Sequence, residues 1–588
     1  MRITRRFFFG LVSAIAYGLY RKSNAKTTGE TSSSQIVANQ VGYYPNSPKL
    51  AFLLNLSNPT SNQVQLLDAR TKKTVFVSEL AESYTDEASQ DIIQTIDFTN
   101  FSQVGRYYLK YGNLQSYPFD IGTDIYQDAL TKLLRSYYLQ RCGIAINDRV
   151  TGVSHPPCHL NDGMFAHSDQ FHQAGETKST QGGWHDAGDF GKYVATATVT
   201  IGSLLSLYEQ YPNLFSDRQL NIPESGTGTP DILDEVQVGL DWLLKMQRED
   251  GAVYRKLSGK NWPGYILPNQ DTQQRFIYGI STPETGKFAA AMAMAARIYQ
   301  PFDANSAKTY LQAAQKAWQF LQTQPSMQVD WFEGDDSGSG KYLFGEWDQE
   351  ESLKTDLDDR LWAAVELFIT TGEDSFNQYL TQHLPSFDYT VFGWKDPSSL
   401  GMINYLMQKE GKGSDNLKEQ IKEKLMKRAD TLLKKVDSSG YHLANDQFIW
   451  ASNKKVAEEG INLVYAYQLT GNRAYLTAAV EQLDYLLGRN HFNLSFITGV
   501  GSNSVQHVHH RIAKAQQIVI PGLMVGGPNT HAQDEIAPKG LGPLSYIDDD
   551  RSYATNENAI DYNAPAIALI GMLMAQEDLQ GTSSAARN

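Results

Sequence analysis

The sequence contains very little cysteine and has no run of basic residues beyond its N-terminus. Only Cys142 and Cys158 occur in 588 residues, which excludes a disulfide-rich scaffold. Lysine and arginine together number 51 against 65 aspartates and glutamates, so the net charge is −14. Because binding to nucleic acid needs a basic surface, this balance argues against a nucleic-acid partner.

Long apolar runs are also missing, apart from one near the N-terminus. Residues 10–20 form this segment; Arg5-Arg6 and three phenylalanines precede it, and small residues follow at 23–25. The order is typical of a secretory signal, and the paired arginines indicate the twin-arginine type. The run is short for a membrane span, although an uncleaved anchor is the alternative. We predict a signal over 1–25, a flexible leader over 26–35, and an exported protein without stable membrane insertion.

Aromatic side chains, by contrast, are abundant, with 32 Tyr, 25 Phe and 9 Trp. Such side chains suit stacking against sugar faces, although a large helical core would also use them. With 588 residues, the chain is longer than a domain built around one hydrophobic core, so we expect two or more domains.

The chain changes character near residue 123. Short β-rich segments at 50–54, 64–67, 75–77 and 107–111 are separated by turn residues, and they predict a small β-sandwich over 36–122 that braces the next domain. From 124 to about 578, apolar residues recur every three or four positions, as in helices. A weak helix–turn–helix repeat, with Thr-Gly turns at 371–372 and 470–471, fits either a closed α/α barrel or an open solenoid. Residues 579–588 are expected to form a disordered tail.

Three stretches carry candidate chemistry. The first, QGGWHDAGDFGKYV at 181–194, places Asp186 and Asp189 three positions apart, so that both carboxylates can face one water molecule and deprotonate it. The second, at 546–564, contains Asp548 and Glu557. The third, at 495–511, ends in His509-x-Arg511. Taken without further knowledge, each acidic stretch could also be a surface loop.

Together these stretches resemble the signatures of glycoside hydrolase family 9, the inverting cellulases and their relatives. The 546–564 stretch matches the family's pattern at every constrained position. The resemblance implies a mainly α fold, an (α/α)6 barrel preceded by an immunoglobulin-like β-sandwich. It implies that Glu557 is the proton donor, that Asp189 is the base, and that Asp186 shares the water. The further residues that it places in the site are Asp548 as a supporting acid, His509 beside the catalytic acids, and Arg511, Trp184 and Tyr553 against the substrate.

The function implied is hydrolysis of β-1,4-glucosidic bonds in cellulose or related β-glucans by a monomeric endoglucanase. Two alternatives keep the chemistry, namely an exo-acting cello-oligosaccharide hydrolase and a glucosaminidase. A non-catalytic carbohydrate-binding protein is the alternative from another class, but a lectin has no need of three acids at these spacings.

Two metal sites are also expected. Cys142, Cys158, His159 and His185 are the residue types of a tetrahedral structural zinc site, and some similar family members hold zinc at such positions; a Cys142–Cys158 disulfide is the alternative. The Gly-rich stretch 221–235 offers oxygen ligands for calcium, an ion that the family often binds in this region. The acidic residues of this stretch could equally stabilise the N-terminus of a helix. The calcium candidates are Glu224, Asp231, Asp234 and Glu235.

Overall fold

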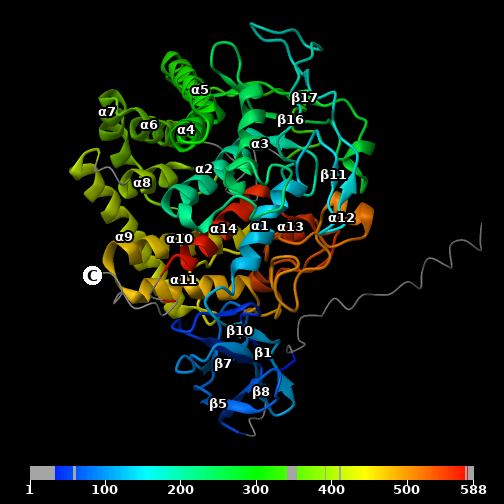
Figure 1. Cartoon of the computed structure of the whole chain (residues 1–588), viewed down its shortest axis with the longest axis vertical. Helices are drawn as coiled ribbons and strands as arrows, with labels where there is room; N and C mark the ends of the chain where they lie inside the picture. Colours follow the sequence, from blue (N-terminus) through cyan, green and yellow to red (C-terminus); the bar gives the residue numbers. More distant parts are fainter. Residues whose placement is uncertain are drawn as a thin grey trace, which may run out of the picture. The chain divides into compact units, whose positions relative to one another are not determined.

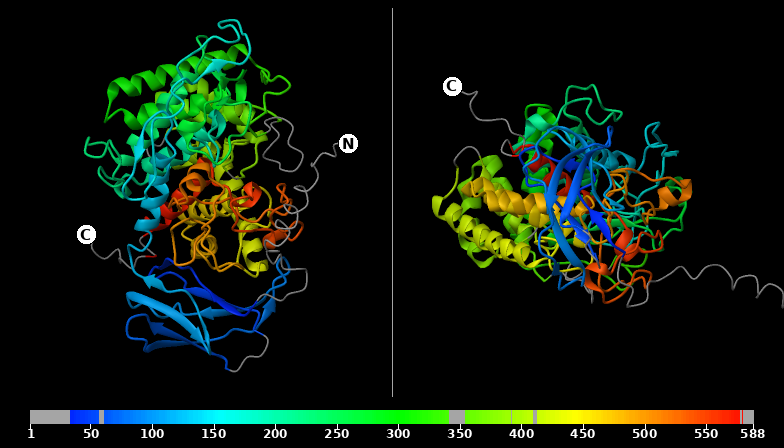
Figure 2. Two further views of the ribbon diagram at one scale, coloured as in Figure 1. Left: turned by 90° about the vertical axis from the view of Figure 1, so that its right-hand side faces the viewer. Right: turned by 90° about the horizontal axis from the view of Figure 1, so that it is seen from below.

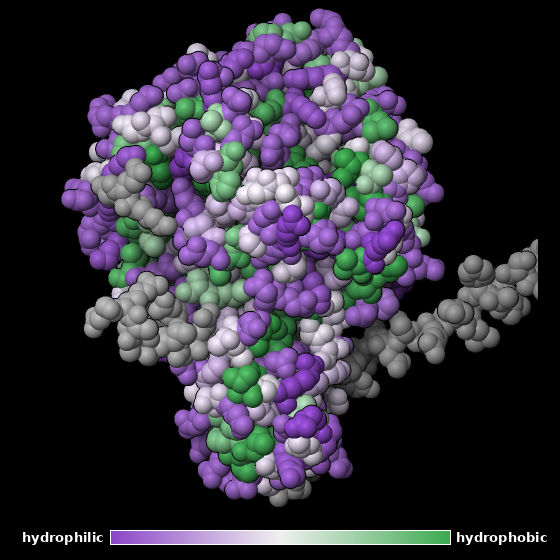
Figure 3. Space-filling model, in the orientation of Figure 1, coloured by the Kyte–Doolittle hydropathy of each residue, from purple (hydrophilic) through white to green (hydrophobic). Residues whose placement is uncertain are grey.

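The computed structural model describes residues 33–56, 61–340, 354–390, 392–408, 412–576 and 579. The predicted signal, nearly all of the leader and nearly all of the tail lie outside these ranges. In the described part, no helix is both long and apolar enough to cross a bilayer. On the face drawn in Figure 3, polar residues dominate and the hydrophobic ones form small, separate patches.

Residues 35–121 form a β-sandwich of two sheets. One has the strand order β1-β3-β7-β6; the other has the order β2-β10-β8-β4-β5, with β9 paired to β8. Tyr43, Phe98 and Phe119 pack together between the sheets, with ring centroids 5.2–5.5 Å apart. The predicted strands correspond to β3, β4, β5 and β8. The strands are β1 (Gln35–Val37), β2 (Gly42–Tyr43), β3 (Leu50–Leu54), β4 (Gln63–Asp68), β5 (Thr74–Glu79), β6 (Tyr84–Thr85), β7 (Ile92–Asp97), β8 (Gly105–Tyr111), β9 (Leu114–Gln115) and β10 (Phe119–Ile121).

Helices dominate the chain from residue 127 to 574. Their ends follow ordinary rules: Ser281 caps the start of α4, with Pro283 in its first turn, and Gly372 and Gly471 end α6 and α10 in the left-handed conformation. The long helices are α1 (Gln127–Leu139), α2 (Val194–Gln210), α3 (Asp231–Met246), α4 (Thr282–Tyr299), α5 (Ala304–Thr323), α6 (Leu357–Thr371), α7 (Asp374–His383), α8 (Ser398–Met407), α9 (Asp415–Ser438), α10 (Ser452–Thr470), α11 (Arg473–Leu486) and α14 (Ile560–Met574).

These helices form an (α/α)6 barrel, as the resemblance implies. Helices α2, α4, α6, α8, α10 and α14 make the inner ring; α14 packs on α2, and α2 packs on α4 (Figure 1). The helices α1, α3, α5, α7, α9 and α11 lie outside them. Most residues of the inner helices are buried, polar ones such as Asp359 of α6 and Glu458 of α10 included, and α14 is buried along its whole length. Helical periodicity alone could not distinguish a closed barrel from an open solenoid. The contact of α14 with α2 shows that the ring is closed.

Polar contacts join the sandwich to the helices. Asn39 donates a hydrogen bond of 2.8 Å to the Asp484 carboxylate on α11. The Asp91 carboxylate accepts the Tyr441 hydroxyl at 2.6 Å and lies 2.6 Å from Nδ1 of His491. Because these groups are largely withdrawn from water, their mutual contacts stabilise the junction. The ribbon views in Figure 2 show the strands of the sandwich next to the helical domain. Buried hydrogen bonds thus attach the sandwich to the helical domain.

Short elements in the long loops cover one end of the barrel. One four-stranded sheet there has the order β13-β17-β16-β14. These elements are β11 (Ile146–Asn147), β12 (Ser154–His155), β13 (Met164–Phe165), β14 (Lys192–Tyr193), β15 (Val253–Tyr254), β16 (Lys256–Ser258), β17 (Phe276–Ile277), β18 (Ile280–Ser281), α12 (Arg511–Gln516) and α13 (Tyr553–Asn556).

Candidate active site

Three loops that are far apart in sequence are joined at one end of the barrel. The Asp186 carbonyl accepts the Ile560 N–H at 2.8 Å, and the Gly188 carbonyl accepts the Arg511 N–H at 3.0 Å. The His509 N–H donates to the Asn556 carbonyl at 2.8 Å. The loops holding all three motifs are therefore fixed to one another through the backbone.

Gly188 is required where these loops meet. A Cβ atom at this position would lie 2.0 Å from the His509 carbonyl oxygen, which no side chain tolerates. Its N–H donates a 3.1 Å hydrogen bond to Oε1 of Glu557. The glycine thus permits the close approach and also orients the Glu557 carboxyl group.

Asp186, Asp189 and Glu557 line one hollow of about 200 Å³. The first two come from the loop before β14, and Glu557 lies between α13 and α14. The aromatic rings that line the same hollow are Tyr193, Trp262, Trp394, Trp450 and Tyr562. Glu284 and Asp561 line it too, and a space bounded by carboxyl groups and flat apolar faces suits a carbohydrate substrate.

Glu557 is held in its protonated form. Burial, followed by the charge of Asp189, raises the pKa of Glu557 to about 8, although Arg511 and the Gly188 N–H oppose the shift. Because the Gly188 N–H donates a hydrogen bond to Oε1 of Glu557, we place the carboxyl proton on Oε2. This carboxyl group can therefore act as an acid at neutral pH.

The two aspartates differ in their surroundings. Burial and the nearby carboxylates of Asp561 and Asp189 raise the pKa of Asp186 well above its usual range, while the Thr196 hydroxyl donates to it. Asp189 accepts the Tyr193 hydroxyl on Oδ2 at 3.2 Å. Its Oδ1 is buried and, among the described residues, has no hydrogen-bond partner. This oxygen of Asp189 therefore has no protein group that competes for its lone pairs.

The predicted polar residues from the other two motifs lie beside this hollow. His509 Nδ1 is 2.6 Å from the Asp550 carbonyl, and burial lowers the pKa of this imidazole. The Arg511 guanidinium donates from Nε to the Pro263 carbonyl at 2.8 Å and lies 5.8 Å from the Trp262 ring. Tyr553 is 40% exposed, so its ring is accessible to a ligand.

Asp548 holds loops together. Its carboxylate accepts the backbone N–H groups of Gln506 and His507, both at 2.9 Å, and the Asn556 amide at 3.0 Å. It fixes the histidine loop next to the residue that precedes Glu557. Among the described residues, it is not part of the lining of the hollow.

Trp184 does not face the substrate space. Only 3% of it is exposed, its indole N–H donates to Glu235 at 2.7 Å, and its ring packs on Tyr137. The prediction that it contacts substrate is corrected here: Trp184 is a core residue behind the catalytic loop. Its position next to His185 and Asp186 could not reveal which way the ring points.

The four calcium candidates do not form one site. Glu224 and Glu235 both bind the guanidinium of Arg141, at 2.9 and 2.8 Å. Asp231, the first residue of α3, accepts the backbone N–H groups of Arg218 and Leu220, at 2.9 and 2.6 Å. The Asp234 carboxylate accepts the Thr227 hydroxyl. These acids therefore bind separate protein groups and do not converge on one ion, which corrects the expected calcium site. The alternative, an acidic residue that stabilises the start of a helix, fits Asp231.

The four zinc candidates do converge. The ligand atoms of Cys142, Cys158, His159 and His185 all lie within 4.8 Å of one another, and all four residues are buried. The cysteines are free thiols, so the disulfide alternative is not what the structure shows. Backbone hydrogen bonds from Cys142 to Gly183 and from His185 to Gln140, both 2.8 Å, bring the segments together. The donor set of two sulfurs and two nitrogens fits a closed tetrahedral metal site.

Sequence patterns did not identify several residues of the site. Tyr193 and Thr196 bind the two aspartates, and Asp561 acts on the pKa of Asp186. Asp561 lies four positions after Glu557 and forms a 2.8 Å ion pair with Lys454. Because Glu557 precedes α14 and Asp561 lies within it, helical spacing does not link the two residues, and only the folded structure places Asp561 near Asp186.

The barrel, the sandwich and the three carboxyl groups define a glycoside hydrolase, and comparison with known proteins specifies which. The family model "Glycosyl hydrolase family 9" matches residues 126–570, and "Cellulase N-terminal ig-like domain" matches residues 31–116. The chain belongs to glycosyl hydrolase family 9 and is a cellulase-type enzyme.

Individual relatives agree with this assignment. The chain is 32% identical to the xyloglucan-specific endo-beta-1,4-glucanase BoGH9A of Bacteroides ovatus, covering 98% of this chain and 99% of that protein. It is 31% identical to endoglucanase D of Acetivibrio thermocellus, over 92% and 83% of the two chains. The crystal structure of a metagenome-derived family 9 endoglucanase superposes with a TM-score of 0.88 at 42% identity, covering 92% of this chain and 99% of that one.

Proposed function

We propose that the chain is an inverting endo-β-1,4-glucanase in which Glu557 is the general acid and Asp189 the general base. The observation that carries the proposal is that Asp186, Asp189 and Glu557 line one hollow, with Glu557 shifted towards its protonated form. An inverting glycosidase needs such a pair, an acid at the leaving oxygen and a base that activates water on the opposite face of the sugar.

Each residue has a defined part in this reaction. Glu557 donates the proton on Oε2 to the glycosidic oxygen while the Gly188 N–H holds Oε1. Asp189 takes a proton from water on its unpartnered Oδ1. Asp186, with its raised pKa, holds the same water by hydrogen bonding. We assign His509, Arg511 and Tyr553 to binding the sugar, and Asp548 to holding the loops.

The experiment is incubation with cellulose derivatives, neutral mixed-linkage glucan, xyloglucan and cello-oligosaccharides, followed by sizing of the products. Internal cleavage gives a broad early range of lengths, whereas release of one short product from polymer would identify an exo-enzyme. Proton NMR of the first product should show the α-anomer. An initial β-anomer would contradict the role of Asp189 in activating water.

We also propose that Cys142, Cys158, His159 and His185 bind one structural zinc ion. The convergence of their ligand atoms supports it, and the Asp271 carboxylate, 3.5 Å from Nε2 of His159, could orient that imidazole. A solved structure similar to this chain, with a TM-score of 0.84, 36% identity, and coverage of 90% of this chain and 99% of that one, is described as a Zn-binding triple mutant of a family 9 endoglucanase, J30. With all four positions ligated, the ion would have no open position and would support the loop that carries Asp186.

Two further assignments stay part of the proposal. The domain division at 36–122 and 124–578 agrees with the matched ranges but is not fixed by them. Export through a twin-arginine-like signal over 1–25 rests on the sequence pattern alone, and N-terminal sequencing of the secreted protein would test it.

A further inference from the structure

A second hollow lies outside the catalytic one, and its volume is about 650 Å³. We call it the rim groove; its lining comes from the 165–170 loop, the 248–254 turn, residues 277–279, the end of α5 and the 328–332 segment. This volume is in the range of ligand pockets, about 300–1,000 Å³. None of the proposed catalytic residues lines it, so the proposed reaction does not account for it.

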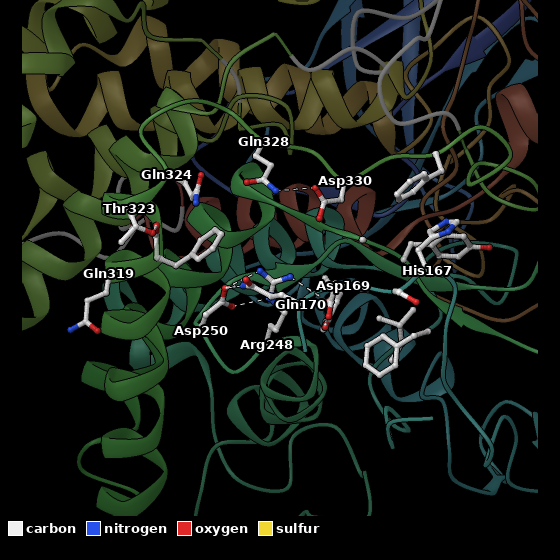
Figure 4. A pocket seen from close by; sticks show the side chains of 18 residues that line it. His167, Asp169, Gln170, Arg248, Asp250, Gln319, Thr323, Gln324, Gln328 and Asp330 are labelled. Atoms are coloured by element: carbon white, nitrogen blue, oxygen red, sulfur yellow. Dashed lines mark hydrogen bonds and ion pairs between the residues drawn. The ribbon is translucent and has the colours of Figure 1, made fainter. Parts of the chain in front are cut away.

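The rim groove is on the catalytic end of the barrel. Helix α4 begins near Glu284, which lines the catalytic hollow, and α5 returns antiparallel to it, so the C-terminal end of α5 comes back to the same end. Figure 4 shows Gln319, Thr323 and Gln324 along one side, with Gln328 and Asp330 at the edge and Arg248 at the floor. A polymer bound in the catalytic hollow would therefore have the groove on its own side of the enzyme.

One carboxylate separates the two hollows. Asp335 is 3.2 Å from the Arg255 guanidinium, which lines the catalytic hollow, and 2.6 Å from Nε2 of His167, which lines the groove. The same Asp335 accepts the Phe332 backbone N–H at 3.0 Å. The wall between the hollows is thus a buried ionic network, and Phe332 is anchored to it.

Phe332 presents an aromatic ring at the edge of the groove. It is 50% exposed, and its ring lies 4.1 Å from the His167 ring. An exposed phenylalanine loses the stabilisation that burial would give, yet here the ring is held by the stack and by the Asp335 hydrogen bond. A fixed, exposed, flat apolar face is what stacks against the apolar face of a pyranose ring.

The polar lining selects a neutral ligand. Its arginine, Arg248, is held by both Asp169 and Asp250, at 3.2 and 2.8 Å, so no cation is left for a phosphate or carboxylate ligand. The acids do not make a metal site, because in the described part the cluster of metal-ligating groups is the cysteine–histidine set. The side-chain amides of Gln319 and Gln324 have no hydrogen-bond partner among the described residues, and an amide can both donate to and accept from hydroxyl groups.

We infer that the rim groove is an accessory saccharide-binding site that takes a neutral segment of the β-glucan substrate. The inference rests on the proposed function for the choice of ligand. Phe332 stacks on one sugar ring at the His167 end of the groove, and the amides of Gln319 and Gln324, on the opposite side in Figure 4, bind hydroxyl groups of another ring of the same glucan. The site thus holds polymer near the catalytic hollow.

Kinetics on two substrates test the site. Phe332→Ala should raise the KM for neutral mixed-linkage β-glucan about five- to thirtyfold, the loss typical of removing an aromatic anchor. It should leave kcat/KM for cellotetraose unchanged, since the catalytic hollow is untouched. Phe302→Ala is the matched control, because Phe302 is a similarly exposed phenylalanine, at 39%, in the turn between α4 and α5 at the other end of these helices. Unchanged polymer KM in Phe332→Ala, or an equal loss on both substrates, would overturn the inference.

Direct binding separates this inference from the proposed function. Titration of full-length Glu557→Gln protein with cellohexaose should show two sites, one of which disappears when Phe332→Ala is added. One site in both proteins, or two in both, would overturn the rim groove. Should Phe332→Ala fail to fold, as judged by circular dichroism, Gln319→Ala with Gln324→Ala takes its place. Failure of the proposed function gives a different result, namely a wild-type enzyme that cleaves no glucan, and the titration then still decides the groove.

Discussion

At the scale of single residues, the chemistry depends on how differently the three carboxyl groups are surrounded. Glu557 is buried beside Asp189 and holds its proton, whereas Asp189 keeps one oxygen without a partner. The same side-chain type behaves differently because burial and neighbouring charge act on each group separately. Two predictions belong to this scale.

Replacing either of the two main acids should nearly abolish hydrolysis while the fold stays intact. Glu557→Gln and Asp189→Asn should each cost at least about 10²–10⁴-fold in kcat on an unactivated glucan, the contribution of a general acid or base. Asp128→Asn, which alters an exposed acid on α1, is the matched control and should keep full activity. Near-normal turnover in either active-site variant would contradict its assigned role; an activated aryl substrate is unsuitable, because its leaving group needs no acid.

The raised pKa of Glu557 predicts the alkaline limit of activity and a pH-dependent stability. Activity as kcat/KM should fall as pH rises through about 8, when the acid loses its proton. The pKa of Glu557 is higher in the folded than in the unfolded protein, so the folded state keeps the proton up to a higher pH. The free energy of unfolding therefore falls as the pH rises from about 4.5 to 8. Glu557→Gln removes this effect.

Thermal unfolding of the two proteins checks the sign. Glu557→Gln should melt higher than the wild type above pH 8, and the difference should shrink towards pH 4. A variant that melts lower than the wild type at pH 9 would show that Glu557 is not a destabilised buried acid.

At the scale of elements, the site depends on loops held at fixed distances by glycine and by the cysteine–histidine cluster. Gly188→Ala would push a Cβ atom to 2.0 Å from the His509 carbonyl, so the catalytic loop must shift. We expect a loss of at least about tenfold in kcat/KM, since small misplacements of reacting groups are costly. The control is Gly264→Ala, whose added Cβ meets nothing within 4 Å. Equal activities of the two variants would show that the loop contact is not needed.

The proposed zinc ion predicts a linked loss of stability and activity. Protein purified without added metal should contain one zinc per chain by elemental analysis, and a strong chelator should lower the melting temperature before activity declines. Cys142→Ser should behave like the chelated protein, while Ser154→Ala, which changes a nearby exposed hydroxyl outside the cluster, should not. Metal-free protein of unchanged melting temperature and activity would refute the site.

At the scale of the whole molecule, the sandwich and the barrel are joined through buried polar pairs. Burial alone would raise the pKa of Asp91, but its hydrogen bonds and ion pair with His491, together with the Tyr441 hydroxyl, lower it to about 2. Because the pKa of Asp91 is lower in the folded than in the unfolded protein, the ionised carboxylate stabilises the fold at pH values above about 4. This stabilisation is lost as the pH falls towards 2.

Asp91→Asn should therefore weaken the junction at neutral pH. We expect a loss of about 1–2 kcal/mol, discounted from the pKa shift because His491 is partly exposed. Calorimetry at pH 7 and at pH 3 measures it; the melting temperature of the variant should be lower at pH 7, and the difference should narrow at pH 3. Asp68→Asn, in a sandwich turn away from the junction, is the control. A difference that grows as the pH falls would have the wrong sign for this ion pair.

The sequence by itself determined the local structure and the chemistry at the motifs. The predicted segments 50–54 and 107–111 became β3 and β8, and the predicted helical region from 124 onward contains the helices α1 to α14, because apolar periodicity reflects which face of a helix or strand is buried. The family resemblance placed Asp186, Asp189 and Glu557, and the structure brings them to one hollow. The cysteine–histidine set was also predicted, from residue types together with the family resemblance, although the sequence left a disulfide as the alternative.

Only the tertiary structure decided which side chains face the substrate space and which already have partners. Trp184 is buried against Glu235 and Tyr137, and the acids of 224–235 bind Arg141 and backbone N–H groups. The closed ring depends on the contact of α14 with α2, about 350 residues apart in the chain, which local periodicity does not encode. The rim groove likewise exists only where five separate segments meet. Burial and pairing arise between segments distant in sequence, and for that reason a linear pattern fixed the residue types of this enzyme but not their surroundings.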